Sequence, residues 1–531
     1  MTVEWLNTRE GERLGALGPA VDDAIADLVE RDAVARIWAG DHTLWQDDPT
    51  EVADRLGWLR VGPEIAAAQG DLDRFAADVY GDGFHHVLVM GMGGSSLFPE
   101  VIATTFARPD DRPRLSVLDS TDPAALRRVE SALDLDRTLF VASSKSGSTL
   151  ETASHLAYFW DKVGRPEHFA VVTDGGSALE ATAVERGFRR VFVNRPDIGG
   201  RYSALSYFGM VPAALAGVDY LRLLRSADVV AEQLSPDGDP HRHPGLRLGA
   251  VMAAAAKAGR DKLTLLLDPD VASFGLWLEQ LIAESTGKAG TGVVPVAGED
   301  VAHDLSVYGD DRLFVGLGWH PALDELADAG HPVVELPFEN AYGLGAQVLL
   351  WEFATAICGA GLGINPFDQP NVAEAKAATN DVLAHLEAGD GDPLAVPSEP
   401  LDGLLAQVRP GDYLSIQAYV DPEAPVVAEL QRVRLALRDR LGVATTLGVG
   451  PRFLHSTGQL HKGGPPSGVF VQVIDDAAAA DGGGPAIPGQ AFGFGTLLAA
   501  QAAGDLATLR THGLRAARVT LDDLLAAGAG A

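Results

Sequence analysis

Short apolar runs alternate with helix-like segments over much of the chain. Five apolar runs have the length of buried strands, and segments with helical apolar spacing separate them. The runs cover residues 86–90, 115–118, 139–142, 169–173 and 190–193. Strands that alternate with helices in this way predict an α/β protein with a doubly wound parallel sheet.

A second series of the same kind begins near residue 245. Its predicted strands cover residues 263–267, 293–296, 313–316 and 332–336. Helical segments at 249–254 and 274–281 lie between them, and a long apolar helix at 343–361 follows. The pattern therefore predicts two similar α/β units, although the sequence shows no clear repeat.

The two units have flanking segments. Residues 1–80 have helical apolar spacing, and residues 385–405 are rich in Gly, Asp and Pro, which is typical of a loop or linker. Strands are predicted at 413–419 and 469–474, and helices at 424–441 and 495–507. The expected division is a helical N-terminal segment (1–80), a first unit (81–230), a second unit (231–384) and a C-terminal segment (385–531) that folds back to complete the second unit.

Composition narrows the class of protein. The chain has 531 residues, too many for one core, and it is 47% hydrophobic and 21% charged, a balance typical of soluble globular proteins. Neither a transmembrane helix nor a secretory signal is predicted. The single cysteine, Cys358, lies in an apolar stretch, so we expect a buried side chain and a reducing, cytoplasmic location.

The chain is strongly acidic. Its net charge is −32, from 41 basic and 73 acidic side chains. A surface of this kind repels nucleic acids and anionic membranes, so neither is expected as a partner. A phosphorylated small molecule would need a local pocket with donors or positive charge.

Two turns of the first unit contain the donors that a phosphate requires. The sequence GMGGSS at 91–96 follows one predicted strand, and SSKSGSTLET at 143–152 follows another. Backbone N–H groups at a helix N-terminus attract anions, and hydroxyls add further donors. The first turn matches neither a Walker loop nor a dinucleotide fingerprint, so an ordinary tight turn remains an alternative. Helix capping alone is the alternative for the second turn.

Three further motifs make a specific resemblance. They are GGRYS at 199–203, AESTGK at 283–288 and NPFDQPNVAEAK at 365–376. Together with the two turns, and in this order, they resemble the glucose-6-phosphate isomerase (phosphoglucose isomerase) family. The resemblance implies two sugar-isomerase (SIS) domains and reversible conversion of glucose 6-phosphate and fructose 6-phosphate in glycolysis and gluconeogenesis. It also implies a homodimer that uses no metal and no cofactor.

The resemblance assigns roles to particular positions. In the family pattern, Arg201 faces the developing enediolate, Glu284 is the base that transfers the proton, and Gln369 and Lys376 belong to the last motif. Glu151 lies near the substrate. The positions that match the family's sugar-phosphate site are Gly94, Ser95, Ser144, Lys145, Ser146 and Thr149.

The proposed chemistry requires these residue types independently. Aldose–ketose isomerisation moves a proton between C2 and C1 of an open-chain sugar, and one carboxylate can remove it and return it. An enediolate needs a fixed cation, which arginine supplies because its charge does not titrate. The closed sugar ring needs a further group, a histidine or a lysine, to help open it.

The histidine motif departs from the family order. The family places its ring-opening histidine about twenty to thirty residues after the base, where this chain has only His303. The matching sequence, LHSTGQLHK, lies instead at 454–462. We therefore expect His455 to open the ring, with His303 as the alternative and His461 as a further candidate for the pocket lining. This late position resembles the isomerase half of bifunctional transaldolase/glucose-6-phosphate isomerase proteins.

The sequence leaves two other functions open. A non-catalytic sugar-phosphate sensor would keep the hydroxyl turns but would not need Glu284, Arg201 and Lys376. An isomerase of another sugar phosphate, such as an amino sugar phosphate, would be expected to have a glutaminase domain, which the sequence does not show.

Overall fold

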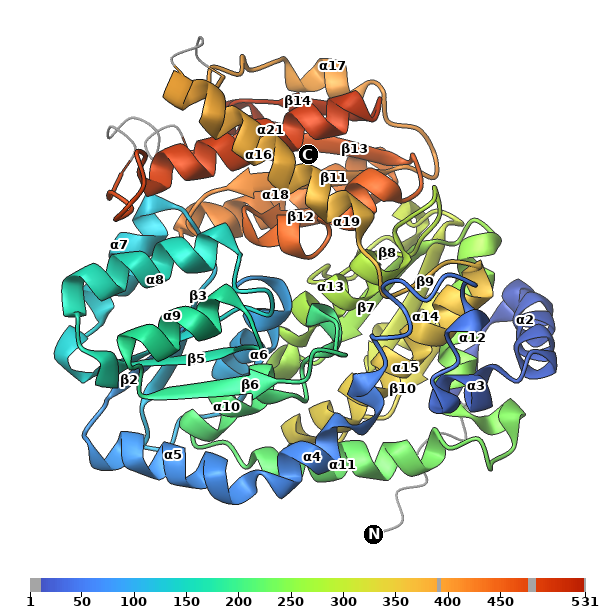
Figure 1. Cartoon of the computed structure of the whole chain (residues 1–531). Coiled ribbons are helices and arrows are strands. Elements are labelled where there is room, and N and C mark those ends of the chain that lie inside the picture. Colours follow the sequence, from blue (N-terminus) through green and yellow to red (C-terminus); the bar gives the residue numbers. More distant parts are fainter. Residues whose placement is uncertain (1–10, 389–392, 476–483, 530–531) are drawn as a thin grey trace.

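The computed structural model describes residues 11–388, 393–475 and 484–529. Its first parallel sheet has the strand order β3-β2-β4-β5-β6 (Figure 1). Each predicted strand of the first unit is present. The bounds are β2 (His86–Met90), β3 (Arg114–Leu118), β4 (Thr138–Ser143), β5 (Phe169–Asp174) and β6 (Arg190–Asn194).

The second sheet has the order β1-β10-β9-β7-β8. Its four predicted strands are parallel, and the two-residue β1 joins them antiparallel to β10. The N-terminal segment, expected to be helical, therefore also contributes a strand. The bounds are β1 (Glu12–Arg13), β7 (Lys262–Leu267), β8 (Val294–Val296), β9 (Arg312–Leu317) and β10 (Val333–Leu336).

The C-terminal segment forms a third parallel sheet with the order β12-β11-β13-β14. Two of its strands, β11 (Tyr413–Tyr419) and β13 (Gly468–Ile474), match predicted runs. The other two, β12 (Ala444–Val449) and β14 (Arg515–Arg518), have no counterpart in the sequence analysis. Among the described residues, these strands pair with one another and not with the second sheet. The division of the chain into four segments stays a prediction.

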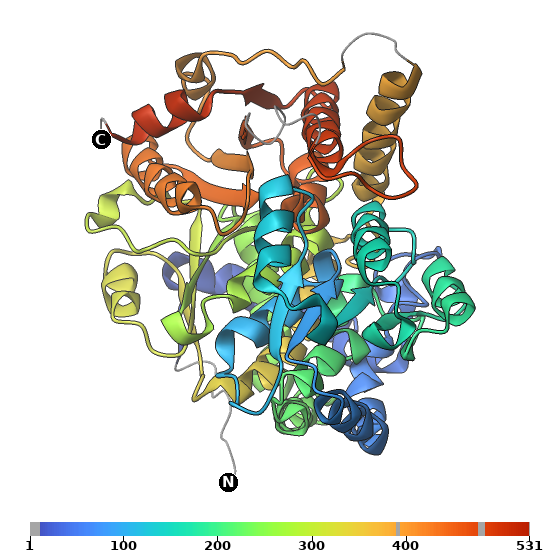
Figure 2. The ribbon, with the colours of Figure 1, turned by 90° about the vertical axis from the view of Figure 1, so that its left-hand side faces the viewer.

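The third sheet lies at one end of the molecule, next to the other two (Figures 1 and 2). One apolar cluster joins it to the second unit through Ala283, Val294 and Phe470. Another joins the C-terminal helices to the first unit through Phe494 and Phe159. The C-terminal segment therefore contacts both units, which brings its side chains between them.

The helices lie between and around the sheets. Of the predicted linker at 385–405, residues 389–392 lie outside the described part, and α17 forms near its end. The main helices are α2 (Gly18–Glu30), α3 (Ala33–Ala39), α4 (Val61–Ala67), α5 (Gln69–Gly81), α6 (Leu97–Thr105), α7 (Pro123–Ala132), α8 (Leu150–Val163), α9 (Ala178–Arg186), α10 (Tyr207–Leu215), α11 (Tyr220–Gln233), α12 (Pro244–Lys257), α13 (Phe274–Thr286), α14 (Ala322–Asp328), α15 (Leu344–Leu362), α16 (Pro370–Ala388), α17 (Leu401–Leu405), α18 (Pro425–Leu441), α19 (Gly458–Gly463), α21 (Phe494–Thr511) and α22 (Leu521–Ala529).

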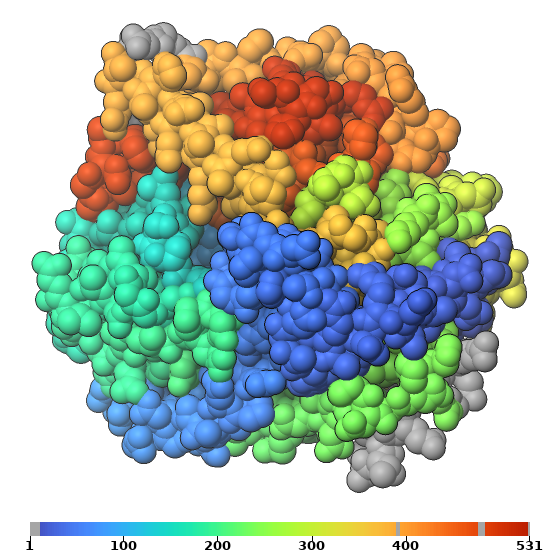
Figure 3. Space-filling model, turned by 45° about the vertical axis from the view of Figure 1, so that its right-hand side comes forward, coloured from blue at the N-terminus to red at the C-terminus, as the bar shows by residue number. Residues whose placement is uncertain are grey.

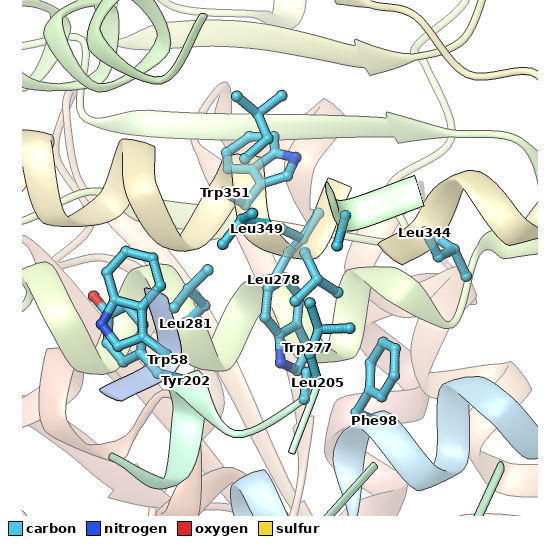
Figure 4. Packing of buried hydrophobic residues seen from close by; sticks show 14 of the residues in the cluster. Trp58, Phe98, Tyr202, Leu205, Trp277, Leu278, Leu281, Leu344, Leu349 and Trp351 are labelled. Carbon is cyan, nitrogen blue, oxygen red and sulfur yellow. The ribbon is translucent and has the colours of Figure 1, made fainter. Parts of the chain in front are cut away.

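One large core connects the N-terminal segment with both α/β units. Trp58, Tyr202, Trp277 and Trp351 come from four distant parts of the chain and are all nearly fully buried (Figure 4). Burial of one large apolar side chain contributes about 1.5–3 kcal/mol. In Figure 3 the N-terminal segment (blue) extends across the middle of the visible face, over the junction between the two units.

Helix α15 is apolar on all sides because it is buried on all sides. The stretch Ala341–Leu362 is long and apolar enough to cross a membrane by length and composition, but 94% of its most apolar 18-residue window is buried inside the structure. It is a core helix of the second unit, between α11, α12 and α13.

Candidate active site

The order of the first sheet fixes where a ligand can approach. From β2 the chain connects to β3 on one side, and from β3 it returns across to β4 on the other. Such a reversal opens a crevice at the carboxyl ends of the two central strands. The turns at 91–96 and 143–149 follow β2 and β4 directly, so the predicted phosphate donors lie at this crevice.

The hydroxyl turn is ordered by its own side chains. Ser144 Oγ lies 3.1 Å from Thr149 Oγ1 and accepts a hydrogen bond from the Gly147 backbone N–H at 3.1 Å. Ser146 is exposed. Lys145 forms an ion pair with Asp174 and donates to the Pro196 carbonyl at 2.9 Å. The predicted hydroxyls share one turn, whereas the Lys145 ammonium is turned toward a carboxylate in this state.

The glycine turn allows two other segments to approach closely. A Cβ on Gly94 would lie 1.8 Å from the Gly200 carbonyl oxygen. Gly93 has φ +55°, and a Cβ there would lie 2.8 Å from the carbonyl oxygen of His455. Glycine at both positions therefore permits the segments with Arg201 and His455 to pack against the turn, which also contains the buried Ser95.

The predicted base lies at the C-terminal end of α13. Glu284 is 6% exposed, and its Oε1 lies 3.4 Å from Arg201 Nη1. Gln280, one turn earlier, donates from Nε2 to Glu284 Oε2 at 3.1 Å and to the His455 carbonyl at 2.8 Å. This amide links the carboxylate to the segment that holds the histidine.

The guanidinium of Arg201 is held on every side. Its Nε donates to Ser285 Oγ at 2.8 Å, and Nη1 donates to Gln369 Oε1 at 2.8 Å. Its Nη2 donates to the carbonyls of Pro366 and Asp368 at 2.7 and 3.0 Å. Four of its five N–H groups are thus hydrogen-bonded, and the ion pair with Glu284 adds to them, so the group is fixed in position and orientation.

His455 pairs with a buried carboxylate. Its Nε2 lies 2.8 Å from Glu151 Oε1, which also accepts a hydrogen bond from Gln501 Nε2 at 2.7 Å. Burial alone would raise the pKa of Glu151. The charge and hydrogen bond of His455, a hydrogen bond from the Glu151 backbone N–H and the charge of Lys376 together outweigh burial and lower the pKa to about 2. Glu151 is therefore an anion at neutral pH, placed to orient the imidazole.

The remaining predicted residues differ in their placement. Gln369 is bound to Arg201, while Lys376 is exposed on α16 with its charge near Glu151. His303 is exposed in the connection between β8 and β9. His461 is buried against Phe470, and burial lowers its pKa well below the usual range. Of these three histidines, His455 is the one that contacts another predicted site residue, Glu151.

Some side chains at the site were not singled out from the sequence. Gln459 donates from Nε2 to the Gly287 carbonyl at 2.9 Å and to Asn371 Oδ1 at 2.7 Å, and thus joins α13 to α16. Its place after His455 in the histidine motif was a usable signal. The position of Gln280, four residues before Glu284, was another, whereas Gln501 has no sequence signal.

A cavity of about 810 Å³ lies elsewhere, along the edge strand β3 between α6 and α7. None of the predicted site residues lines it. The predicted site residues gather instead beside the turns that follow β2 and β4.

The chain is similar in sequence to known glucose-6-phosphate isomerases. Residues 76–303 match the phosphoglucose isomerase family model. A glucose-6-phosphate isomerase from Citrifermentans bemidjiense is 34% identical over 281 residues, 48% of this chain and 52% of that protein, so the match spans about half of the relative's length. One from Geobacter sulfurreducens is 29% identical over 428 residues, 66% of this chain and 79% of that protein.

Solved structures support the fold. A glucose-6-phosphate isomerase from Chlamydia trachomatis aligns with a TM-score of 0.60 at 20% identity, over 69% of this chain and 86% of that one. A hypothetical protein from Thermus thermophilus also aligns with a TM-score of 0.60, at 24% identity, over 70% of this chain and 100% of that one. Through residues 76–303 and these sequence relatives, the chain is similar to the phosphoglucose isomerase family.

Proposed function

We propose that the chain interconverts glucose 6-phosphate and fructose 6-phosphate without a metal or cofactor. The observation that supports this most is the meeting of Glu284, Arg201 and the His455–Glu151 pair beside the turns at β2 and β4. The match of residues 76–303 to the phosphoglucose isomerase family model supports a sugar-phosphate isomerase, and the individual roles below are part of the proposal.

In this proposal the hydroxyl turn binds the phosphate. Ser144, Ser146 and Thr149 donate hydrogen bonds, together with backbone N–H groups at the start of α8. Gly94 and Ser95 form the opposite wall. Lys145 would exchange its contact with Asp174 for the phosphate.

His455 then acts on the closed ring. Its imidazole moves a proton between the ring oxygen and the C1 hydroxyl, while Glu151 holds Nε2 in place. Lys376, exposed nearby on α16, supplies a further positive charge at this end of the site.

Glu284 next removes the proton from C2 of the open sugar and returns it to C1. Negative charge develops on the oxygens of the cis-enediolate, and Arg201 faces it with a charge that needs no reorganisation. Gln369, the exposed partner of Arg201 Nη1, is the contact that the substrate can displace most easily.

A coupled assay tests the function. Fructose 6-phosphate is supplied with EDTA, and glucose 6-phosphate is detected through its dehydrogenase. Turnover should fall by about 10²–10⁴-fold in Glu284→Gln, and it should be unchanged in Glu185→Gln, an exposed position on α9. Folded protein that binds the sugar phosphate but shows no turnover would favour a sensor. A cytoplasmic location and a homodimer remain predictions.

A further inference from the structure

Lys288 is a buried cation whose ammonium group binds Asp368. It follows the C-terminus of α13 and is 5% exposed. Its Nζ donates to both the side-chain Oδ1 and the backbone carbonyl of Asp368, each at 2.6 Å. A buried ammonium is costly unless it is paired, so this contact strongly favours one position of Asp368.

Asp368 is also a partner of Arg201. Its carbonyl oxygen accepts from Lys288 Nζ and from Arg201 Nη2, at 2.6 and 3.0 Å. The next residue, Gln369, accepts from Arg201 Nη1, and α16 with Lys376 begins directly afterwards. Lys288 and Arg201 thus both bind the carbonyl of Asp368. These contacts fix the position of Gln369 and of the start of α16.

We propose that Lys288 is a positioning residue, which holds Asp368 so that Gln369 and the start of α16 stay in register with Arg201 and Glu284. The inference rests on the isomerase function proposed above. Lys288 acts through Asp368 and does not itself touch the reacting atoms.

The charges around Lys288 make this role sensitive to pH. Burial and the neighbouring Arg201 lower the pKa of Lys288 to about 8, while Asp368 and Glu284 act in the opposite direction. The amine of Lys288 is therefore mostly protonated below pH 8, and it loses its charge as the pH rises through that value. The contact with Asp368 weakens over the same range, so activity should fall there.

Three variants separate positioning from simple structural support. Lys288→Met removes the charge at similar size and should lower kcat about 10–100-fold with KM changed less than threefold. Lys288→Arg keeps a charge that does not titrate and should move the alkaline fall of kcat up by at least one pH unit. Asp368→Asn removes the anion that supports the lysine charge and should move the same fall to lower pH. Lys257→Met, an exposed position at the end of α12, is the matched control.

The outcomes can be told apart. If wild-type protein shows no turnover of fructose 6-phosphate, both the function and this inference are overturned. If wild type is active and folded Lys288→Met stays within twofold of it, only the inference is overturned. The inference alone is also overturned if kcat falls at the same alkaline pH in wild type, Lys288→Arg and Asp368→Asn. Should Lys288→Met fail to fold, the opposite shifts in the other two variants decide the question.

Discussion

Replacement of Arg201 by lysine is the perturbation whose effect the structure predicts in most detail. Arginine has five N–H donors in a planar fork, whereas lysine has three on one nitrogen. The carbonyls of Pro366 and Asp368, Ser285 Oγ, Gln369 and Glu284 cannot all be reached by an ammonium. In the variant, the Asp368 carbonyl still accepts a hydrogen bond from Lys288, and the exposed Gln369 can bind water.

The carbonyl of Pro366 determines the effect on stability. Within the described residues its hydrogen bond comes from Arg201 alone, and Pro366 is buried. A buried acceptor left without a partner costs about 1–3 kcal/mol, so Arg201→Lys should lower the free energy of unfolding by that amount. Loss of a fixed donor that faces the enediolate should lower kcat about 10²–10³-fold.

Two measurements on the same protein test this prediction. Denaturant unfolding compares Arg201→Lys with Arg165→Lys, in which a partly exposed arginine pairs with the exposed Asp136 and the expected change is below about 0.5 kcal/mol. The coupled assay gives kcat for both. An Arg201→Lys protein with kcat within threefold of wild type, or as stable as Arg165→Lys, would show that the fork of the arginine is not required.

Three further variants test other contacts. His455→Asn should lower kcat about 100-fold while His303→Asn leaves it unchanged, and equal effects would contradict the assignment. Glu151 has its pKa lowered to about 2, so its ionisation stabilises the fold above the usual carboxyl pKa and is lost as the pH falls through the folded value. The stability difference between wild type and Glu151→Gln should therefore shrink by about 2 kcal/mol between pH 7 and pH 3, and a constant difference would exclude this role. Lys462 and Asp505 form a buried ion pair, so Lys462→Met should cost about 3–5 kcal/mol, and adding Asp505→Leu should restore most of it; additive losses would argue against the pairing.

Much of the sheet structure could be predicted because buried parallel strands are continuous apolar runs. The strand β12 was not predicted because Thr445, Thr446 and Gly448 interrupt its apolar pattern. The strand β14 has arginine at both ends, Arg515 and Arg518, and β1 has only two residues. The third sheet could not be separated from the second unit, because the pattern of a strand does not show which strand it pairs with.

The site was predictable only where a motif marked it. Glu151 and His455 lie 304 positions apart in sequence, and no spacing rule brings them together. Their contact depends on the C-terminal segment packing against both units through Phe494 and Phe470. Gln501, which completes the Glu151 contact, comes from a helix whose sequence predicts only burial.

The most direct test of the central claim follows the proton itself. Wild type and Glu284→Gln are incubated with fructose 6-phosphate in D2O, and the sugar phosphates are analysed by NMR. Proton transfer through Glu284 predicts that wild type places deuterium at C1 of fructose 6-phosphate and at C2 of glucose 6-phosphate, and that Glu284→Gln incorporates almost none. Equal deuterium incorporation by Glu284→Gln and wild type would contradict the account.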